Sequence, residues 1–241
     1  MTSTIETRDE NADCADSYRS MALRMIEGAV RLLLAGIIKL SLAPFRKTDS
    51  DIIRHSMYGS LRKFFSCQKR DPSGQLNVLS ISGSSYLARL ACAGAESVVV
   101  EASYPEISIL SLPYPDESFD IVVSDQVFEH IEGDPFMAMA EAFRVLKKGG
   151  VAVHTTVLLF QIHGYPSDYW RFTPDGLRLL CRGQAEVLSC GGWGNRYVWF
   201  LSWLGVIFGE KVPDANWHPY SWIAAFNEWR YPVVTWVVAR E

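Results

Sequence analysis

Cysteine is scarce in this chain, and no two cysteines have the spacing of a metal site. The 241 residues contain five cysteines, and none of them forms a Cys-x-x-Cys pair. An odd number of widely spaced cysteines favours reduced structural thiols over disulfides or a zinc site. We therefore expect no metal ion and a cytoplasmic location.

A strong net charge is also missing. The formal net charge is -4, with 21% charged and 49% hydrophobic residues. This balance is typical of a globular protein rather than a disordered chain, and a weakly acidic chain has no general electrostatic attraction to nucleic acid. We expect no nucleic-acid partner.

Hydrophobic runs long enough to cross a bilayer are absent. The apolar run from Leu32 to Ile38 is much shorter than the roughly 18 residues that a spanning helix needs. Residues 1–20 are polar, so we expect a flexible tail there and no secretory signal. The length is enough for one domain with an extension.

An amphipathic helix is predicted from Met21 to Ala43, the first part of a helical N-terminal extension over residues 21–71. Apolar residues repeat at helical spacing beside a narrow polar stripe of Arg24, Glu27, Arg31 and Lys39. The pattern favours packing onto the domain or a second subunit, with docking on a membrane surface as the alternative. A second helix is expected from Asp51 to Phe65.

Residues 119–157 read as strand, helix and strand. The apolar run Ile121–Val123 predicts a buried strand of a parallel sheet, and Ser124, Asp125 and Gln126 follow at its carboxyl end. Asp134 and Pro135 predict a helix start, and Gly149 a helix end after Lys147 and Lys148. Ligands of open α/β sheets bind at the carboxyl edge, which makes this edge the candidate site.

The same stretch resembles a known family. The runs LPYPDESFDIVVSDQVFEHI and EAFRVLKKGG are similar to class I S-adenosylmethionine-dependent methyltransferases of the methyltransferase type 11 kind. The resemblance covers roughly Leu76 to Leu180. It implies an α/β fold with a doubly wound, mostly parallel Rossmann-like sheet, a C-terminal antiparallel strand pair, and S-adenosylmethionine as cofactor.

The cofactor loop that this resemblance implies is degenerate. Of the family's three glycines only Gly83 remains, and Ser80 stands in place of an acidic residue. Glu101 follows Gly83 at close to the spacing of about 20 residues at which a carboxylate accepts bonds from ribose hydroxyls. The resemblance places further residues beside the cofactor: Ser82, Ala102, Ser108, Ile109, Leu112, Ser124, Asp125 and Gln126.

A polar loop follows the strand that ends at Val157. It contains His163, Asp168 and Arg171, where His163 is a candidate general base and Arg171 a candidate anion clamp. Asp168 and Arg171 could equally brace the loop. His130, in the turn after the central strand, could contact the cofactor or assist proton transfer, and it could also serve a local backbone hydrogen bond.

The methyltransferase-like domain is expected over residues 72–241, with a tryptophan-rich insertion at residues 191–232. Six of the eight tryptophans lie there. The insertion could be a lid whose tryptophans pack inside it, which we favour, or a dimer surface or a membrane-interface patch.

The sequence thus predicts a methyltransferase that acts on an oxygen or nitrogen of a small molecule or of a sugar or glycoconjugate. Serines at positions 80, 82, 84 and 108 keep two alternatives open. One is a non-catalytic binding or scaffold protein, and the other is an enzyme of this fold with non-methyl chemistry.

Overall fold

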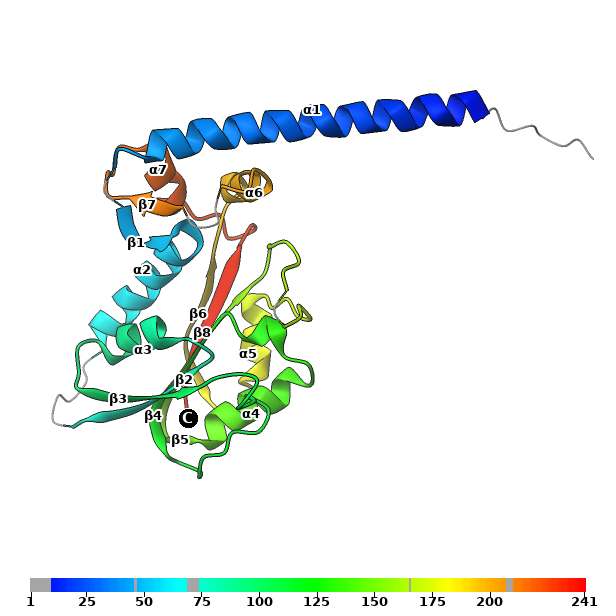
Figure 1. Ribbon diagram of the computed structural model, residues 1–241. Helices are drawn as coiled ribbons and strands as arrows, with labels where there is room; N and C mark the ends of the chain where they lie inside the picture. Colours follow the sequence, from blue (N-terminus) through cyan, green and yellow to red (C-terminus); the bar gives the residue numbers. More distant parts are fainter. Residues whose placement is uncertain (1–9, 46, 69–73, 165, 207–209) are drawn as a thin grey trace, which may run out of the picture.

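A six-stranded sheet forms the centre of the molecule (Figure 1). The computed structural model describes residues 10–45, 47–68, 74–164, 166–206 and 210–241, so the expected tail at residues 1–9 and the domain boundary near residue 72 lie outside the described residues. The sheet order is β3-β2-β4-β5-β8-β6. These strands span Ser97–Ala102, Leu76–Ile81, Phe119–Asp125, Leu146–Val157, Val234–Arg240 and Glu186–Trp193 respectively.

Strand directions confirm the expected fold class. β3, β2, β4 and β5 are parallel, whereas β8 runs antiparallel to both β5 and β6. The antiparallel pair at the C-terminal side is therefore β6 with β8. Because β4 lies between β2 and β5, its carboxyl end at Asp125 falls in the middle of the ligand edge.

Helices cover both faces of the sheet. α2 (Ile52–Cys67) and α3 (Ser85–Cys92) pack on one face, and α4 (Pro135–Arg144) and α5 (Pro174–Leu180) on the other. Neighbouring β4 residues point in opposite directions, so Val123 belongs to the first apolar cluster and Val122 to the second. The continuous apolar run is explained by this two-sided burial.

The predicted helix start at Asp134 is confirmed, and one predicted helix end is wrong. The Asp134 side chain accepts the Phe136 N–H at 2.8 Å, and Thr173 caps α5 in the same way by accepting the Gly176 N–H at 3.0 Å. α4 ends at Arg144, so Lys147 lies in β5 instead of in the last helical turn. The strand begins at Leu146 because this residue pairs with Phe119 of β4.

The front helix is longer and less covered than predicted. α1 runs from Glu10 to Leu42, so the expectation of a flexible tail through residue 20 is wrong for residues 10–20. The expected packing on the domain is present only at its end, where Leu42 is buried and Leu34, Ala35 and Ile38 pack against the core, whereas Leu23 and Leu33 are 67% and 65% exposed. No helix among the described residues has the length and apolarity to cross a bilayer.

The tryptophan-rich insertion joins the N-terminal extension. It contains α6 (Arg196–Trp203), β7 (Lys211–Pro213) and α7 (Pro219–Ala225), and β7 pairs antiparallel with β1 (Lys47–Asp51). Of its tryptophans only Trp193 is buried, whereas Trp217, Trp222 and Trp229 are more than 60% exposed. The expectation that these tryptophans pack inside a lid is therefore wrong.

Candidate functional site

A cavity of about 510 Å³ opens at the carboxyl edge of the sheet. Its wall includes Ser82 after β2, Ser108 and Ile109 in the loop after β3, Gln126 after β4, and His130 in the short helix η1 (Phe128–His130). Five of the residues singled out from the sequence are thus brought together. The volume lies in the range of small-molecule and cofactor sites. No described residue of the insertion is part of this wall.

The loop after β2 has the shape of a ligand-binding turn despite its lost glycines. Ser82 and Gly83 both have positive φ, 51° and 79°, and the space beside Gly83 is open. The Gly83 N–H donates to the Glu101 carboxylate, and the Ser82 N–H donates to the Ala102 carbonyl at 2.9 Å. β2 and β3 are parallel, and Ser80 pairs with Glu101. Glu101 therefore lies next to the loop that follows β2.

Asp125 and Gln126 meet the N-terminal extension. Asp125 Oδ2 accepts hydrogen bonds from Arg54 Nε, at 3.2 Å, and from the Tyr58 hydroxyl. Arg54 Nη2 donates a hydrogen bond to Gln126 Oε1 at 2.8 Å. Burial and the neighbouring Asp125 raise the pKa of Tyr58, so the phenol stays a donor. Asp125 is thereby held from the side of α2 and does not line the cavity, whereas Gln126 does.

Three other predicted cofactor contacts lie behind the cavity. Ser124 is fully buried and shares a 2.8 Å hydrogen bond with Nδ1 of His154, whose pKa is lowered to about 3 by burial. Ala102 and Leu112 are buried in the apolar cluster under the α4 side. None of these three residues lines the cavity.

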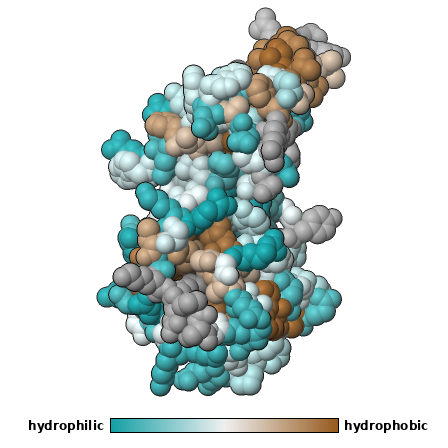
Figure 2. All heavy atoms as spheres, turned by 90° about the vertical axis from the view of Figure 1, so that its left-hand side faces the viewer, coloured by the Kyte–Doolittle hydropathy of each residue, from teal (hydrophilic) through white to brown (hydrophobic). Residues whose placement is uncertain are grey.

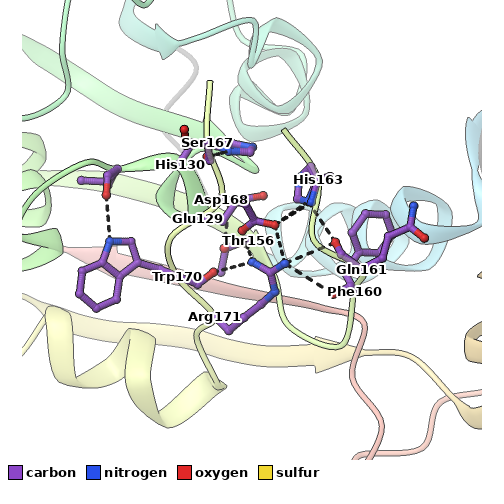
Figure 3. Close-up of polar contacts among 11 residues, drawn as sticks. Glu129, His130, Thr156, Phe160, Gln161, His163, Ser167, Asp168, Trp170 and Arg171 are labelled. Carbon is purple, nitrogen blue, oxygen red and sulfur yellow. Dashed lines mark hydrogen bonds and ion pairs between the residues drawn. The ribbon is translucent and has the colours of Figure 1, made fainter. Parts of the chain in front are cut away.

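His130 lines the cavity and is hydrogen-bonded to the polar loop at Ser167 (Figure 3). Its Nδ1 lies 2.5 Å from the Ser167 carbonyl, and a carbonyl can only accept, so Nδ1 carries the proton. The lone pair of the neutral ring is therefore on Nε2. The expected backbone hydrogen bond is therefore not local to the turn but reaches Ser167 in the polar loop, and it leaves Nε2 without that bond.

Glu129, next to His130, is a buried carboxyl. Thr156 donates to its Oε2 at 2.9 Å, while no described residue is hydrogen-bonded to its Oε1. Burial raises the pKa of Glu129 to about 7. Its backbone carbonyl accepts the N–H groups of Tyr169 and Trp170, which fastens the polar loop to η1.

His163 and Arg171 do not line the cavity. Arg171 forms a two-pronged ion pair with Asp168 and otherwise bonds only to backbone carbonyls of its own loop. These contacts are those of a brace, and the Arg171 guanidinium holds the pKa of Asp168 below its usual range. His163 Nδ1 lies 3.1 Å from Asp168, and its ring meets the His130 ring edge-on at 4.9 Å.

Glu129, His130 and His163 also form a compact cluster. Each of them offers one ligand atom, and these atoms lie within 4.8 Å of one another. Such a set could receive a metal ion after side-chain rotation, and it could equally pass a proton. Ligand atoms 2.0–2.2 Å from a tetrahedral zinc ion would be roughly 3.4 Å apart, so the cluster as it stands is too wide.

Some residues of the site were not predicted. Arg54 and Tyr58 are far from Asp125 in the chain, and a helical pattern gives no sign of a contact across that distance. Tyr169, which lines the cavity, could have been suggested by its position, because it belongs to the same aromatic and charged loop as His163.

The comparisons with known proteins agree with this geometry. Residues 64–154 match the family described as methyltransferase domain. An uncharacterized methyltransferase of Schizosaccharomyces pombe is 42% identical over 80 residues, 33% of this chain and 26% of that protein. A probable S-adenosylmethionine-dependent methyltransferase of Mycolicibacterium smegmatis is 44% identical over 62 residues, 24% of each chain. The matches thus span about a quarter of these relatives.

Solved structures extend the likeness of the fold. A phosphoethanolamine N-methyltransferase of Haemonchus contortus in complex with S-adenosyl-L-methionine has a TM-score of 0.51 at 13% identity, covering 78% of this chain and 52% of that one. An S-adenosylmethionine-dependent methyltransferase of Mesorhizobium loti has a TM-score of 0.50 at 14% identity, covering 79% and 100%. Residues 64–154 thus resemble the methyltransferase domain family, and the fold is like that of solved S-adenosylmethionine-dependent methyltransferases.

Proposed function

We propose that this protein is an S-adenosylmethionine-dependent methyltransferase acting on an oxygen or nitrogen of a small molecule or of a sugar or glycoconjugate. The observation that carries the proposal is one cavity whose wall includes residues from the turn after β2 and from the turn after β4. Ser82, with positive φ, belongs to this wall, and Glu101 is hydrogen-bonded to the adjacent Gly83. His130 lies at the cavity wall after β4.

The residues present fit the cofactor. Positive φ at Ser82 and Gly83 turns the backbone so that it can approach a ligand closely, and Glu101 offers a carboxylate for ribose hydroxyls. The Nε2 amide of Gln126 is buried and has no hydrogen-bond partner among the described residues, so it is a donor in need of an acceptor. Ser82, Glu101 and Gln126 would hold the cofactor, with Ser108 and Ile109 along its side.

The protein's own contribution is placement and proton handling. When bound, S-adenosylmethionine supplies an electrophilic methyl group, which is chemistry that the cofactor carries. The wall would orient the substrate nucleophile in line with that group. His130 Nε2 is placed to accept the proton that the substrate hydroxyl or amine loses. Tyr169 forms part of the cavity wall.

The experiment that separates this proposal from a non-catalytic scaffold is direct binding. Calorimetry on the full chain should show saturable binding of S-adenosylmethionine and of S-adenosylhomocysteine. Methyl transfer can then be sought with methyl-labelled cofactor across sugars, glycoconjugates and small hydroxyl or amine compounds. Absence of binding for both cofactor forms would contradict the proposal, and binding without any transfer would favour the scaffold.

A further inference from the structure

α1 turns one apolar face to the body of the protein and leaves a second apolar face uncovered. The residues that pack against the core on the first face are Leu34, Ala35, Ile38 and Leu42. On the same side, Arg31 lies over the ring of Trp203 in α6, 5.2 Å from its centroid. These contacts fix the rotation of α1 about its axis, so the second face points away from the body.

The uncovered face has the spacing of a coiled-coil seam. Its apolar residues recur alternately three and four positions apart, which is the pattern of positions a and d in a heptad. These seam residues are each at least 44% exposed, and they are Leu23, Ile26, Val30, Leu33, Ile37 and Leu40. At 3.6 residues per turn, the middle of the seam lies about 140° around the helix from the residues that face the body.

The seam is too long to be an ordinary surface feature. At a rise of 1.5 Å per residue it runs for about 27 Å. Figure 1 shows α1 extending well past the body of the protein, and the space-filling view shows an apolar projection at one end of the molecule (Figure 2). Contiguous apolar surface of this kind marks a contact site. The heptad spacing specifies a helix as the partner, because a and d side chains fit between those of a facing helix.

The positions beside the seam suit a closely packed second helix. On the flank away from the body, position g of each heptad has a small residue, and these are Ala22, Ala29 and Gly36. Small side chains at a contact let two helix axes approach closely. Glu27 is the only charged residue at the e and g positions from residue 22 to residue 41. Two seams therefore meet without a row of like charges along their flanks.

The charges along α1 favour a second copy of the same helix in the opposite direction. The helix has four acidic and four basic residues, with three of the acidic ones in residues 10–16 and all the basic ones from residue 19 onward. An antiparallel pair brings the acidic start of each helix toward the basic end of the other and opposes the two helix dipoles. A parallel pair would set the two acidic starts side by side.

We propose that α1 pairs antiparallel with α1 of a second copy of this chain, and that the protein is a dimer through this seam. The register that covers the whole seam sets Val30 against the partner's Leu33, Ile26 against the partner's Ile37, and Leu23 against the partner's Leu40. The two bodies then lie toward opposite ends of the helix pair, because each body packs on the C-terminal part of α1. The pairing does not depend on the proposed methyl transfer, since the seam shares no residue with the cavity wall.

Sedimentation velocity of the full chain tests the pairing. At micromolar concentration the wild type should sediment as a dimer, with twice the 27.1 kDa of the chain. The double variant Val30→Glu/Leu33→Glu places carboxylates at the centre of the apolar contact and should raise the dimer dissociation constant by about a hundredfold or more. Its near-ultraviolet circular dichroism should show that the aromatic side chains of the body still pack as in the wild type.

A matched control on the same helix is Met25→Glu/Leu32→Glu. Met25 and Leu32 are 67% and 77% exposed but lie at position c, off the seam, so this variant should remain a dimer. Benzoylphenylalanine in place of Leu40 should photo-crosslink near the partner's Leu23, which mass spectrometry of the linked peptides locates.

Four results would overturn the proposal. The first is a wild-type monomer, whether or not it binds lipid vesicles. The second is a dimer that Val30→Glu/Leu33→Glu leaves intact, and the third is an equal loss of the dimer in the control variant. The fourth is a crosslink from position 40 to position 40 of the partner, which would mean a parallel pair.

Discussion

Arg54 Nε lies 3.2 Å from Asp125 Oδ2, so a helix of the N-terminal extension is joined to the carboxyl end of the central strand. The same guanidinium donates to Gln126, which lines the cavity. Asp125 has only 9% of its side chain exposed. The extension is therefore a structural part of the site and not an appendage to the domain.

This relationship predicts the effect of Arg54→Ala. Removal of the guanidinium leaves a largely buried carboxylate without its cation, and loss of a charge-assisted bond costs roughly 1–3 kcal/mol in the free energy of unfolding. Urea denaturation should measure the loss. Arg62→Ala is the matched control on the same helix, because Arg62 is exposed and donates to the hydroxyl of the half-buried Tyr86, and it should change stability by less than about 0.5 kcal/mol. Equal effects of the two variants would contradict the assigned role of Arg54.

Glu101→Ala should weaken S-adenosylmethionine binding by about tenfold or more, since each charge-assisted bond to a ribose hydroxyl is worth roughly 1.5–3 kcal/mol. Calorimetry measures this directly. Glu96→Ala removes another exposed carboxylate, which bonds Gln75, and should leave the affinity unchanged. An unaltered affinity in Glu101→Ala would show that the ribose is held elsewhere.

The two histidines should differ in their effect on turnover. His130→Ala should lower kcat by about a hundredfold with unchanged cofactor affinity, because general-base catalysis contributes that much. His163→Ala should lower kcat less, since its ring contacts His130 and is not part of the cavity wall. Single-turnover rates with labelled cofactor show which of the two variants loses more activity. His55→Ala serves as the control, and a larger loss in His163→Ala than in His130→Ala would make His163 the base.

Glu129 predicts a pH dependence of stability. Its pKa is raised from 4.5 to about 7 by burial, so between these values the unfolded chain ionises while the folded protein keeps the proton. The free energy of unfolding should therefore fall as pH rises from about 4.5 to about 7, by on the order of 3 kcal/mol. Glu129→Gln, which mimics the protonated acid, should lack this decrease.

Thermal denaturation across this pH range checks the prediction. Glu106→Gln, at an exposed position, is the control and should follow the wild-type curve. A stability difference between wild type and Glu129→Gln that does not change with pH would mean that Glu129 has an ordinary pKa in the folded protein.

The width of the Glu129, His130 and His163 cluster predicts that methyl transfer needs no metal. Dialysis against a chelator should leave the rate unchanged. Added zinc ions should inhibit, since coordination would occupy His130 Nε2. A rate that falls with the chelator and returns with one divalent ion would contradict this and would make the cluster a metal site.

Local sequence determined much of the fold. Asp134 and Thr173 begin their helices because a side-chain oxygen can satisfy a helix N–H two or three residues ahead, which is a purely local interaction. The run Ile121–Val123 determined a strand buried on both faces. Glu101 reaches the loop at Gly83 because parallel strands carry their carboxyl ends to one edge, so that part of the site followed from the order of elements.

Contacts between distant segments were decided only by the tertiary structure. Nothing near Arg54 in the sequence indicates Asp125, and nothing near β1 indicates β7, because such pairings depend on how whole layers pack. The orientation of α1 is the clearest case. Its apolar pattern determined a helix with one hydrophobic face, but a pattern does not state which face meets the protein. That direction is set at the end of the helix, where Leu42 is buried in the core and Ile38 packs against the same cluster, while Leu33 and Leu40 remain exposed.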